Sequence, residues 1–320
     1  MISAESLATY FNDYISNPDF MPSEPNGLFE PVSYMLGSGG KRLRPVLLLA
    51  TCEALGSDFR RAMGQAVAVE MFHNFTLLHD DVMDRSDMRH GRPTVHRRWN
   101  EATAILSGDA MLTMAQMWVM RADARMAQEL ANTFNLVAMD VYRGQQYDMD
   151  FEARNDVSVN EYIEMIRLKT AVLLAGSCLL GATVAGASES VCEAMWRYGI
   201  NLGLAFQLQD DYLDTFGDSA VFGKPIGGDI ACGKKTWLLI NAMTADDSGE
   251  LEQAMALTDR NAKVEAVRNI YVAHNLHNRC RELINDYTRK ALAALDEVEM
   301  SEDAREIFVS LAEKAAVRDR

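Results

Sequence analysis

The sequence contains few cysteines, and they are scattered singly. They form no C-x-x-C pair and lie far apart in the chain, at Cys52, Cys178, Cys192, Cys232 and Cys280. Disulfide frameworks and structural zinc sites show paired or regularly spaced cysteines, so this pattern favours reduced thiols in the core of a cytoplasmic protein. The N-terminus, from Met1 to Ser6, has no basic segment followed by an apolar one, so we expect no secretory signal.

Basic charge is also scarce, and long apolar runs are missing. The chain has 31 Lys and Arg against 46 Asp and Glu, for a net charge of -15. Nucleic-acid binding depends on clustered positive charge, so we expect no nucleic-acid partner. No uncharged apolar run approaches the roughly 20 residues of a membrane-spanning helix, so we expect no membrane span.

Proline is absent between Pro93 and Pro225 and again after Pro225. These stretches are rich in strong helix formers, so they predict successive helices. Hairpin signals between alternating strands are missing, and we expect the single Asn26-Gly27 in a proline-rich loop. Nothing marks an internal linker, so we predict one all-α domain over residues 1–320. We predict helices over roughly 3–16, from about 30, from about 43, and over 61–88, 100–121, 123–150, 158–185, 188–215, 234–244, 261–284 and 301–316.

Two acidic clusters have the same form, D-D-x-x-D. They are Asp80-Asp81-Val82-Met83-Asp84 and Asp210-Asp211-Tyr212-Leu213-Asp214. Residues four apart share a helix face, so each cluster stacks like charges, which lowers helix stability. Three carboxylates near a helix C-terminus also oppose the helix dipole. Carboxylate oxygens are the ligands that Mg²⁺ prefers beside phosphate oxygens, so the clusters predict metal sites.

Cations and glycines accompany both clusters. Gly39-Gly40-Lys41-Arg42-Leu43-Arg44-Pro45 places three cations before a helix, a position that suits an anion. Arg89-His90-Gly91-Arg92 follows the first cluster, and Gly91 and Pro93 are plausible stops for its helix. A glycine-rich segment with Lys224 and Lys234 follows the second cluster and could close over phosphate. Lys169-Thr170 lies among aliphatic residues, where a lysine by itself favours reaching out to water.

The charges of these groups balance if they bind two diphosphates. Six aspartates contribute about -6 and two diphosphates about -6, while three Mg²⁺ supply about +6. A further charge of about +6 comes from Lys41, Arg44, Arg89, Lys169, Lys224 and Lys234.

Together, these motifs resemble the all-trans isoprenyl diphosphate synthases of the polyprenyl synthetase family, from about residue 30 to the C-terminus. Five elements agree with the family pattern in order and spacing. They are the basic motif, the two aspartate motifs, Lys169-Thr170, and the Phe206-Gln207 pair that leads into the second aspartate motif. The resemblance implies a single bundle of long helices around a deep central cavity, with both aspartate motifs facing it, and usually a homodimer. It implies a Mg²⁺-dependent, head-to-tail condensation of isopentenyl diphosphate with an allylic diphosphate.

The resemblance also implies roles for individual residues. Asp80, Asp84 and Asp210 would bind Mg²⁺ directly, with Asp81, Asp211 and Asp214 ligating it or ordering its waters. Arg89, Lys169 and Lys224 would hold the allylic diphosphate, with Lys234 beyond them. Lys41, Arg44 and His73 would hold isopentenyl diphosphate. Lys169, the Thr170 carbonyl and Gln207 would stabilise the allylic cation.

One residue departs from the family pattern, in which two arginines follow the first motif. Here the pair is Arg89-His90. Histidine is weakly charged at neutral pH and lacks the bidentate fork of arginine. We therefore expect weaker isopentenyl diphosphate binding that tightens as pH falls toward about 6.

Product length depends on the residues just before the first motif. Phe75 and Thr76 precede it, and the motif has no inserted residues, a pattern that resembles enzymes making C20 geranylgeranyl diphosphate. Phe72 lies one turn deeper and is the alternative floor of the product pocket. C15 farnesyl diphosphate is the alternative product. A class I terpene cyclase, a regulatory subunit and a calcium-binding protein are less favoured, because both motifs are intact and no EF-hand spacing is present.

Overall fold

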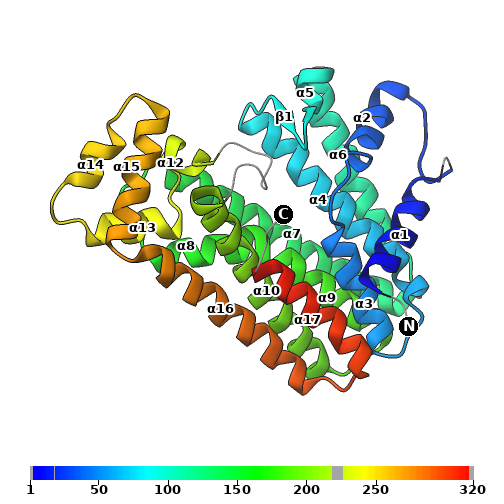
Figure 1. Cartoon of the computed structure of the whole chain (residues 1–320). Coiled ribbons are helices and arrows are strands. Elements are labelled where there is room, and N and C mark those ends of the chain that lie inside the picture. The colour runs from blue at the N-terminus through cyan, green and yellow to red at the C-terminus, as the bar shows by residue number, and fades with distance from the viewer. Residues whose placement is uncertain (1–2, 18, 218–225, 317–320) are drawn as a thin grey trace. The chain divides into compact units, whose positions relative to one another are not determined.

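Helices make up nearly all regular structure in the computed structural model, which describes residues 3–17, 19–217 and 226–316 (Figure 1). The chain forms two compact units. The first runs up to Leu136 and adds Gly176–Glu193 and Glu299–Ile307; the second holds Val137–Ala175, Ala194–Val298 and the residues from Phe308. The all-α expectation is confirmed. The single domain around one cavity stays a prediction.

The first unit contains the early helices and a short hairpin. Its elements are α1 (Ala4–Ile15), α2 (Asn26–Leu36), α3 (Leu43–Ala54), the 3₁₀ turn η1 (Phe59–Ala62), α4 (Met63–Met83), β1 (Met88–Arg89), β2 (Arg92–Pro93), α5 (Val95–Arg98) and α6 (Glu101–Val119). Helix α4 packs along α6 and α3. Buried aliphatic and aromatic side chains fill the space between these helices, among them Leu7, Phe11, Leu47, Leu48, Met71 and Met111. The aspartates of the first motif therefore sit at the end of a well-packed helix.

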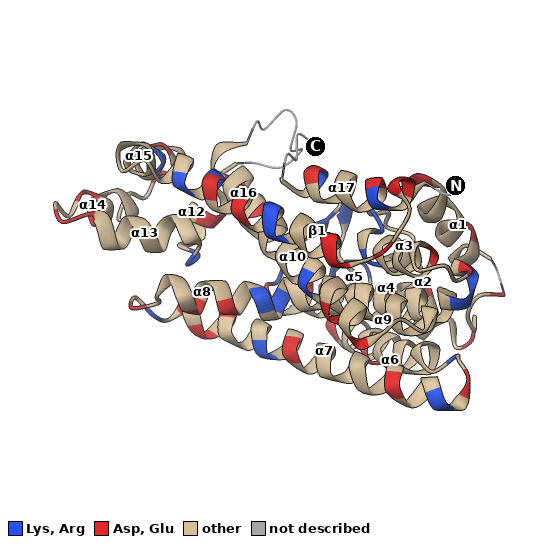
Figure 2. Ribbon diagram, turned by 90° about the horizontal axis from the view of Figure 1, so that it is seen from below, with Lys and Arg blue, Asp and Glu red and all other residues tan. Residues whose placement is uncertain are grey.

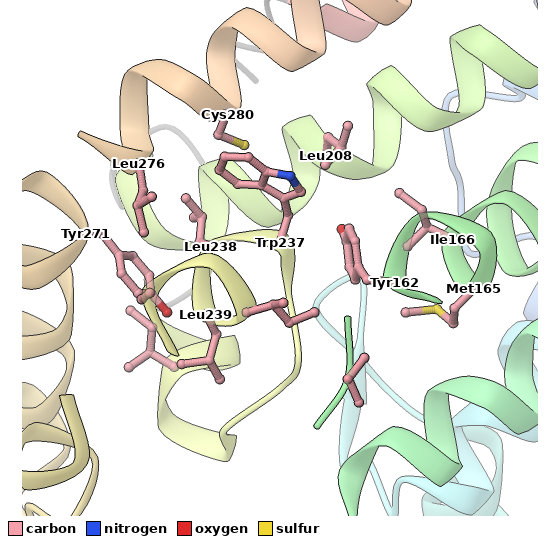
Figure 3. Close-up of a cluster of buried hydrophobic side chains, with 14 of the residues drawn as sticks. Tyr162, Met165, Ile166, Leu208, Trp237, Leu238, Leu239, Tyr271, Leu276 and Cys280 are labelled. Carbon is pink, nitrogen blue, oxygen red and sulfur yellow. The ribbon is translucent and has the colours of Figure 1, made fainter. Parts of the chain in front are cut away.

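Most helices of the second unit follow the proline-poor stretches of the sequence. They are α8 (Val159–Ile166), the π turn η2 (Arg167–Ala171), α12 (Gly228–Cys232), α13 (Trp237–Ala245), α14 (Glu250–Met255), α15 (Arg260–Ala273), α16 (Leu276–Ala294) and the 3₁₀ turn η3 (Leu295–Glu297). Four helices have residues in both units: α7 (Ala124–Glu152), α9 (Val172–Ala185), α10 (Glu189–Phe216) and α17 (Glu302–Ala316). Helix α13 packs against α8, α15 and α16 around an apolar cluster that includes Tyr162, Leu208 and Trp237 (Figure 3).

Side-chain caps begin several helices where the sequence supplies them. Ser158 and Glu161 form a capping box at α8, in which each side chain accepts from the other residue's backbone N–H. Asn100 accepts from Thr103 N at 2.8 Å at α6, and Asp259 accepts from Ala262 N at 2.8 Å at α15. These local signals account for the agreement between predicted and observed helix starts near 101, 159 and 260.

Several predicted boundaries were wrong, among them the end predicted at 284, which the structure places at Ala294. Helix α2 begins at Asn26 rather than near Glu30, so Asn26-Gly27 is helical and Pro31 lies inside the helix. The predicted 261–284 helix is two helices, because Asn275 takes a left-handed conformation (φ 56°) that asparagine tolerates. The predicted 158–185 helix is interrupted by the π turn. The helix predicted over 61–88 ends at Met83.

The end of α4 has a local cause. Arg85 is left-handed (φ 52°), and Ser86 N donates to Asp81 O at 3.0 Å, which is the helix-terminating pattern usually made by glycine. The chain then forms an antiparallel hairpin in which Arg89 pairs with Arg92. His90 and Gly91 make its two-residue turn, both with positive φ (49° and 73°), as a type I′ turn requires. Position 85 is arginine rather than glycine, so the sequence did not predict that the helix ends at Met83.

The cysteines and charges agree in part with expectation. All five cysteines are free thiols; Cys52, Cys178 and Cys280 are buried, but Cys232 is exposed, so the core placement was wrong for that residue. Figure 2 shows acidic and basic residues mixed along helices such as α7, with acidic residues in excess over the chain.

One segment, Val159–Ala185, is long and apolar enough to cross a bilayer, with a mean hydropathy of 1.7 over its most apolar stretch. The expectation that no apolar run approaches this length was therefore wrong, since residues 170–188 carry no charge. Of that stretch 83% is buried, and the segment carries Arg167 and Lys169. Core helices can be equally apolar, so burial in the protein accounts for its composition.

Candidate active site

The first aspartate motif occupies the last turn of α4. Asp81 is buried, Asp80 is half-buried, and Asp84 is exposed at the C-cap. Arg89 Nε donates to Asp81 Oδ1 at 2.9 Å, so the hairpin returns a cation to the motif. Burial raises the pKa of Asp81, and the nearby Arg89 only partly offsets this. Asp81 Oδ2 is buried without a hydrogen-bond partner among the described residues, so the carboxylate has unused acceptor capacity.

Cations gather around His73, about two helical turns before the motif on α4. Burial lowers the pKa of His73 well below its usual range, and Arg44, Arg89 and Arg42 lower it further. His73 is therefore neutral at physiological pH and can offer one N–H without adding charge. His90 also acts on it electrostatically, so His73, Arg44 and His90, which are predicted to bind isopentenyl diphosphate, share one neighbourhood.

The basic loop before α3 is anchored by its middle cation. Arg42 adopts a left-handed conformation (φ 49°) and is buried. Its guanidinium donates to Glu70 Oε1 at 2.5 Å, to Leu36 O at 2.5 Å and to Asn12 Oδ1 at 2.9 Å. Each of the three guanidinium nitrogens thus donates one hydrogen bond, and this buried arginine holds the loop in place. Lys41 is exposed and Arg44 is half-buried on either side of it.

The second aspartate motif lies inside α10 and has different partners. Tyr162 on α8 donates a hydrogen bond to Asp211 Oδ2, and Gln207 Nε2 donates to Asp211 Oδ1 at 2.9 Å. Thr170 Oγ1 donates in turn to Gln207 Oε1 at 2.9 Å. Asp211 is buried at 4% exposure, whereas Asp210 is half-buried. The motif therefore combines a held carboxylate with a more accessible one.

The start of α12 is tied to the end of the second motif. Asp229 N donates to Asp214 Oδ2 at 2.9 Å, and Gly227 N donates to Asp214 O at 2.6 Å. Gly227 is left-handed (φ 78°), and a Cβ there would clash with the side chain of Val264. This part of the predicted glycine-rich segment thus follows the motif closely, while Lys224 lies outside the described residues.

Lys234 supplies positive charge to these carboxylates. Burial by itself would lower the pKa of Lys234, but Asp211, Asp229 and Asp148 outweigh it and raise the pKa well above its usual value. Burial likewise raises the pKa of Asp229 to about 7, although Lys234 works against this. Carboxylates therefore outnumber cations among the residues around Lys234, and such an arrangement suits a divalent metal ion.

Lys169 lies in the π turn that interrupts the helix. Its Nζ lies 2.6 Å from Asp148 Oδ2, so the lysine pairs with a carboxylate while 29% of its side chain still meets water. Two glycines bring neighbouring helices against the π turn. A Cβ at Gly144 would clash with the backbone of Lys169, and one at Gly203 would clash with Ala171. Only glycine permits this approach, which sets the position of Lys169 and Thr170.

The predicted product-length residues lie on α4 with unequal exposure. Phe72 is fully buried, with its ring centroid 5.6 Å from that of Phe75 and 5.4 Å from that of Phe134. Phe75 is 6% exposed and packs edge-to-face on His79 at 4.7 Å. Thr76 is half-buried, and its hydroxyl donates to His73 O. Both aromatic rings therefore remain candidates for the floor of a pocket.

Sequence reasoning missed three residues of this site. Asp148 pairs with Lys169, Asp229 bonds to Asp214, and Tyr162 bonds to Asp211. Tyr162 precedes Lys169 by two helical turns and directly follows the Ser158–Glu161 capping box, a signal that could have placed it on the same face. The partners of Asp148 and Asp229 depend on chain segments far apart, which no local pattern reports.

The residues present fit magnesium. Within the described ranges, no three Asp, Glu, His or Cys side chains converge to form a complete metal cage. Mg²⁺ usually takes one or two carboxylates and completes its shell with water and substrate phosphate. The buried, unused Oδ2 of Asp81 and the accessible Asp80 and Asp210 are donors of this kind.

Comparisons with known proteins agree with this geometry. The family model described as "Polyprenyl synthetase" matches residues 25–274. A geranylgeranyl pyrophosphate synthase of Geoglobus acetivorans is 39% identical over 92% of this chain and 92% of its own. A geranylgeranyl diphosphate synthase of Saccharolobus solfataricus is 36% identical over 95% of this chain and 96% of its own. A crystal structure of a geranylgeranyl pyrophosphate synthase superposes with a TM-score of 0.94 and 42% identity, covering 99% of both chains.

Proposed function

The chain belongs to the polyprenyl synthetase family, and we propose that it condenses isopentenyl diphosphate with allylic diphosphates to make geranylgeranyl diphosphate (C20). The observation that carries the proposal is the combination of two intact D-D-x-x-D motifs with cations bonded or facing their carboxylates. The C20 product rests on the names of the similar synthases.

Substrate binding divides among the site residues. Magnesium, held by Asp80, Asp84 and Asp210, with Asp81, Asp211 and Asp214 behind them, would stabilise the diphosphate as a leaving group. Arg89, Lys169 and Lys224, with Lys234, add positive charge at the allylic diphosphate. Lys41, Arg44, His73 and His90 hold isopentenyl diphosphate; neutral His73 serves as a hydrogen-bond donor. Three metal ions per site would balance the charge of two diphosphates.

The chemistry is a carbon–carbon bond formation driven by loss of diphosphate. The allylic C–O bond breaks, and its electron pair leaves with the diphosphate. Lys169, the Thr170 carbonyl and the Gln207 side chain face the resulting positive charge and exclude water from it. The isopentenyl double bond attacks the cation, and the departing diphosphate takes the released proton.

Product length is the most specific part of the proposal. In this proposal Phe75, Phe72 and Thr76 on α4 set it, and the contact between the two aromatic rings supports both as candidate floors. We expect Phe75→Ala to lengthen the product beyond C20, because Phe75 keeps some exposure while Phe72 is fully enclosed. Product sizing of Phe75→Ala beside Phe72→Ala checks this: lengthening by Phe72→Ala alone would identify Phe72, and no change in either would exclude both.

A homodimer completes the proposal. Large apolar side chains of the first unit are exposed on α6 and α7, namely Ile105 (43%), Leu106 (59%), Met117 (59%) and Leu136 (70%). Exposed apolar groups of this size on neighbouring helices are typical of protein–protein contacts. We expect the protein to be a cytoplasmic dimer. Light scattering on a size-exclusion column measures its mass, and a monomeric mass of 35.7 kDa would contradict the dimer.

One incubation tests the activity. Purified protein receives isopentenyl diphosphate with a C5, C10 or C15 allylic primer, with and without Mg²⁺, and the products are sized by chromatography. We expect Mg²⁺-dependent extension of each primer to C20. Extension that stops at C15 would make the protein a farnesyl diphosphate synthase. A hydrocarbon released from primer without use of isopentenyl diphosphate would indicate a cyclase, and no product would indicate a regulatory subunit.

A further inference from the structure

Tyr162 has a hydroxyl that its apolar surroundings do not explain. The ring is 1% exposed and lies in the cluster that contains Ile166, Leu208 and Trp237 (Figure 3). Phenylalanine would satisfy that packing equally well. A buried tyrosine hydroxyl needs a hydrogen-bond partner, and here the partner is Asp211 Oδ2.

Asp211 is held on both sides by protein donors. Tyr162 donates to one carboxylate oxygen and Gln207 to the other, and the residue is 4% exposed. A carboxylate whose two oxygens each accept a protein hydrogen bond in a buried place is a poorer metal ligand than its half-buried neighbour Asp210. The middle aspartate of this motif therefore has another task.

The direction of every hydrogen bond in this group follows from Asp211. Gln207 turns its Nε2 toward Asp211 and donates to Oδ1 at 2.9 Å. The Gln207 oxygen then faces away from the carboxylate and accepts from Thr170 Oγ1.

We propose that Tyr162 is a positioning residue, which acts through Asp211 to fix the orientation of the Gln207 amide, to which the Thr170 hydroxyl is bonded, at the reacting allylic group. The inference rests on the proposed function, in which Gln207 stabilises the allylic cation. Tyr162 itself touches no substrate. Its loss frees Asp211 Oδ2 to rotate toward other donors, and the Gln207 amide loses its fixed orientation.

The chain offers a matched control for this hydroxyl. Tyr198 lies on the same helix as Asp211, is fully buried, and donates to Phe308 O at 2.8 Å. Tyr198→Phe removes a buried tyrosine hydroxyl and one hydrogen bond, as Tyr162→Phe does, without touching the aspartate motif. Both substitutions keep an aromatic ring in the apolar core.

A double-mutant cycle separates positioning from a purely structural role. We expect Tyr162→Phe to lower kcat by about 10- to 100-fold, with KM for both substrates within about twofold of wild type. Tyr198→Phe should keep kcat within about twofold of wild type, and it should unfold at a midpoint temperature similar to that of Tyr162→Phe. In a Gln207→Leu background, adding Tyr162→Phe should lower kcat by less than about twofold, because Tyr162 acts through Gln207. Equal kcat in the two tyrosine variants, or additive losses in the cycle, would overturn the positioning role.

A binding measurement gives a readout other than activity. Calorimetry with Mg²⁺ and inorganic pyrophosphate should give Tyr162→Phe an affinity within about threefold of wild type, whereas a loss of about tenfold or more would make Asp211 a metal ligand and overturn the inference. If Tyr162→Phe does not fold, the same cycle with the isosteric Asp211→Asn replaces it, with the same expected non-additivity. Absence of any prenyl product from the wild-type protein would refute the proposed function itself, a result distinct from these outcomes.

Discussion

The first aspartate motif lies at the end of a helix in one unit, whereas the second lies within a helix in the other. In both, the middle aspartate is buried, at 1% for Asp81 and 4% for Asp211. Asp81 receives a charged partner, Arg89, from the hairpin that follows it. Asp211 receives neutral donors, Tyr162 and Gln207. The same five-letter pattern is therefore stabilised by an ion pair in one unit and by hydrogen bonds in the other.

The middle aspartates of the two motifs thus differ in the partners that hold them. A buried carboxylate needs a partner or it becomes protonated, and each unit supplies the partner that its own packing allows. Asp80 and Asp210 are less buried than these middle aspartates. The metal binding proposed for both motifs would therefore take place in unlike surroundings.

The greatest loss of activity should come from the outer aspartates, and it tests whether the two motifs are equivalent in chemistry. Asp80→Ala and Asp210→Ala should each lower kcat/KM by about 10³-fold or more, which corresponds to about 4 kcal/mol of transition-state stabilisation. Steady-state kinetics on both variants measure the loss. Asp87→Ala is the matched control, because Asp87 is an exposed aspartate beyond the first motif, paired with Arg97. A loss at only one motif would contradict the equivalence.

Loss of the ionic partner in the first motif should cost more stability than loss of a neutral partner in the second. Arg89→Met leaves Asp81 buried without its cation, so unfolding free energy at neutral pH should fall by about 3 kcal/mol. Tyr162→Phe removes a neutral donor and should cost less, about 1–2 kcal/mol. Chemical denaturation measures both. Without Arg89 the folded-state pKa of Asp81 rises further, so the loss should shrink as pH falls through that pKa. A loss that does not depend on pH would contradict the ionic account.

The excess of carboxylates beside the second motif should make the stability of the protein depend on pH. The pKa of Asp229 is raised from 3.8 to about 7, so between these values the folded protein binds a proton that the unfolded chain has released. Stability should therefore fall as pH rises through this window in metal-free buffer. Asp229→Asn should abolish this loss of stability and should be about 2 kcal/mol more stable than wild type at pH 8. This value is smaller than the full pKa shift implies, because the carboxyl group is partly accessible to solvent. At pH 4 the two should unfold alike, and a gain of equal size at both pH values would contradict this account.

The most modest change adds a cation beside the first motif. His90→Arg should lower KM for isopentenyl diphosphate by about fivefold at pH 8, since arginine stays charged and can grip phosphate bidentately. The gain should decline toward pH 6, where histidine side chains themselves become charged. His274→Arg, at an exposed position beyond α15, is the matched control. An unchanged KM in His90→Arg would exclude His90 from the binding site.

Much of the helix pattern could be predicted because its signals are local. Helix starts near 101, 159 and 260 have capping side chains in the sequence, and the long proline-free stretches are helical. The end of α4 could not be predicted, because Arg85 takes a conformation usual for glycine. The break at Asn275 and the π turn at Arg167–Ala171 were missed for similar reasons: no proline or glycine marks them.

The charged motif residues of the candidate site could be predicted from the sequence, but the residues that hold them by hydrogen bonds and ion pairs could not. The spacing of Asp80, Asp84, Asp210 and Asp214 is visible in the sequence, as are the lysines and arginines beside them. Nothing local relates Lys169 to Asp148 or Tyr162 to Asp211, which are 21 and 49 residues apart. Such partners are selected by packing between helices.

The helical character of the protein, the places of its acidic and basic motifs, and the family chemistry that they match all follow from the sequence alone, because helix propensity, spacing and residue type act over a few residues. Three further features follow from the folded structure: which carboxylates are buried, which donors satisfy them, and where α4 stops short of its hairpin. Burial and hydrogen bonding between distant segments depend on how each unit packs, and they turn two identical motifs into two different environments.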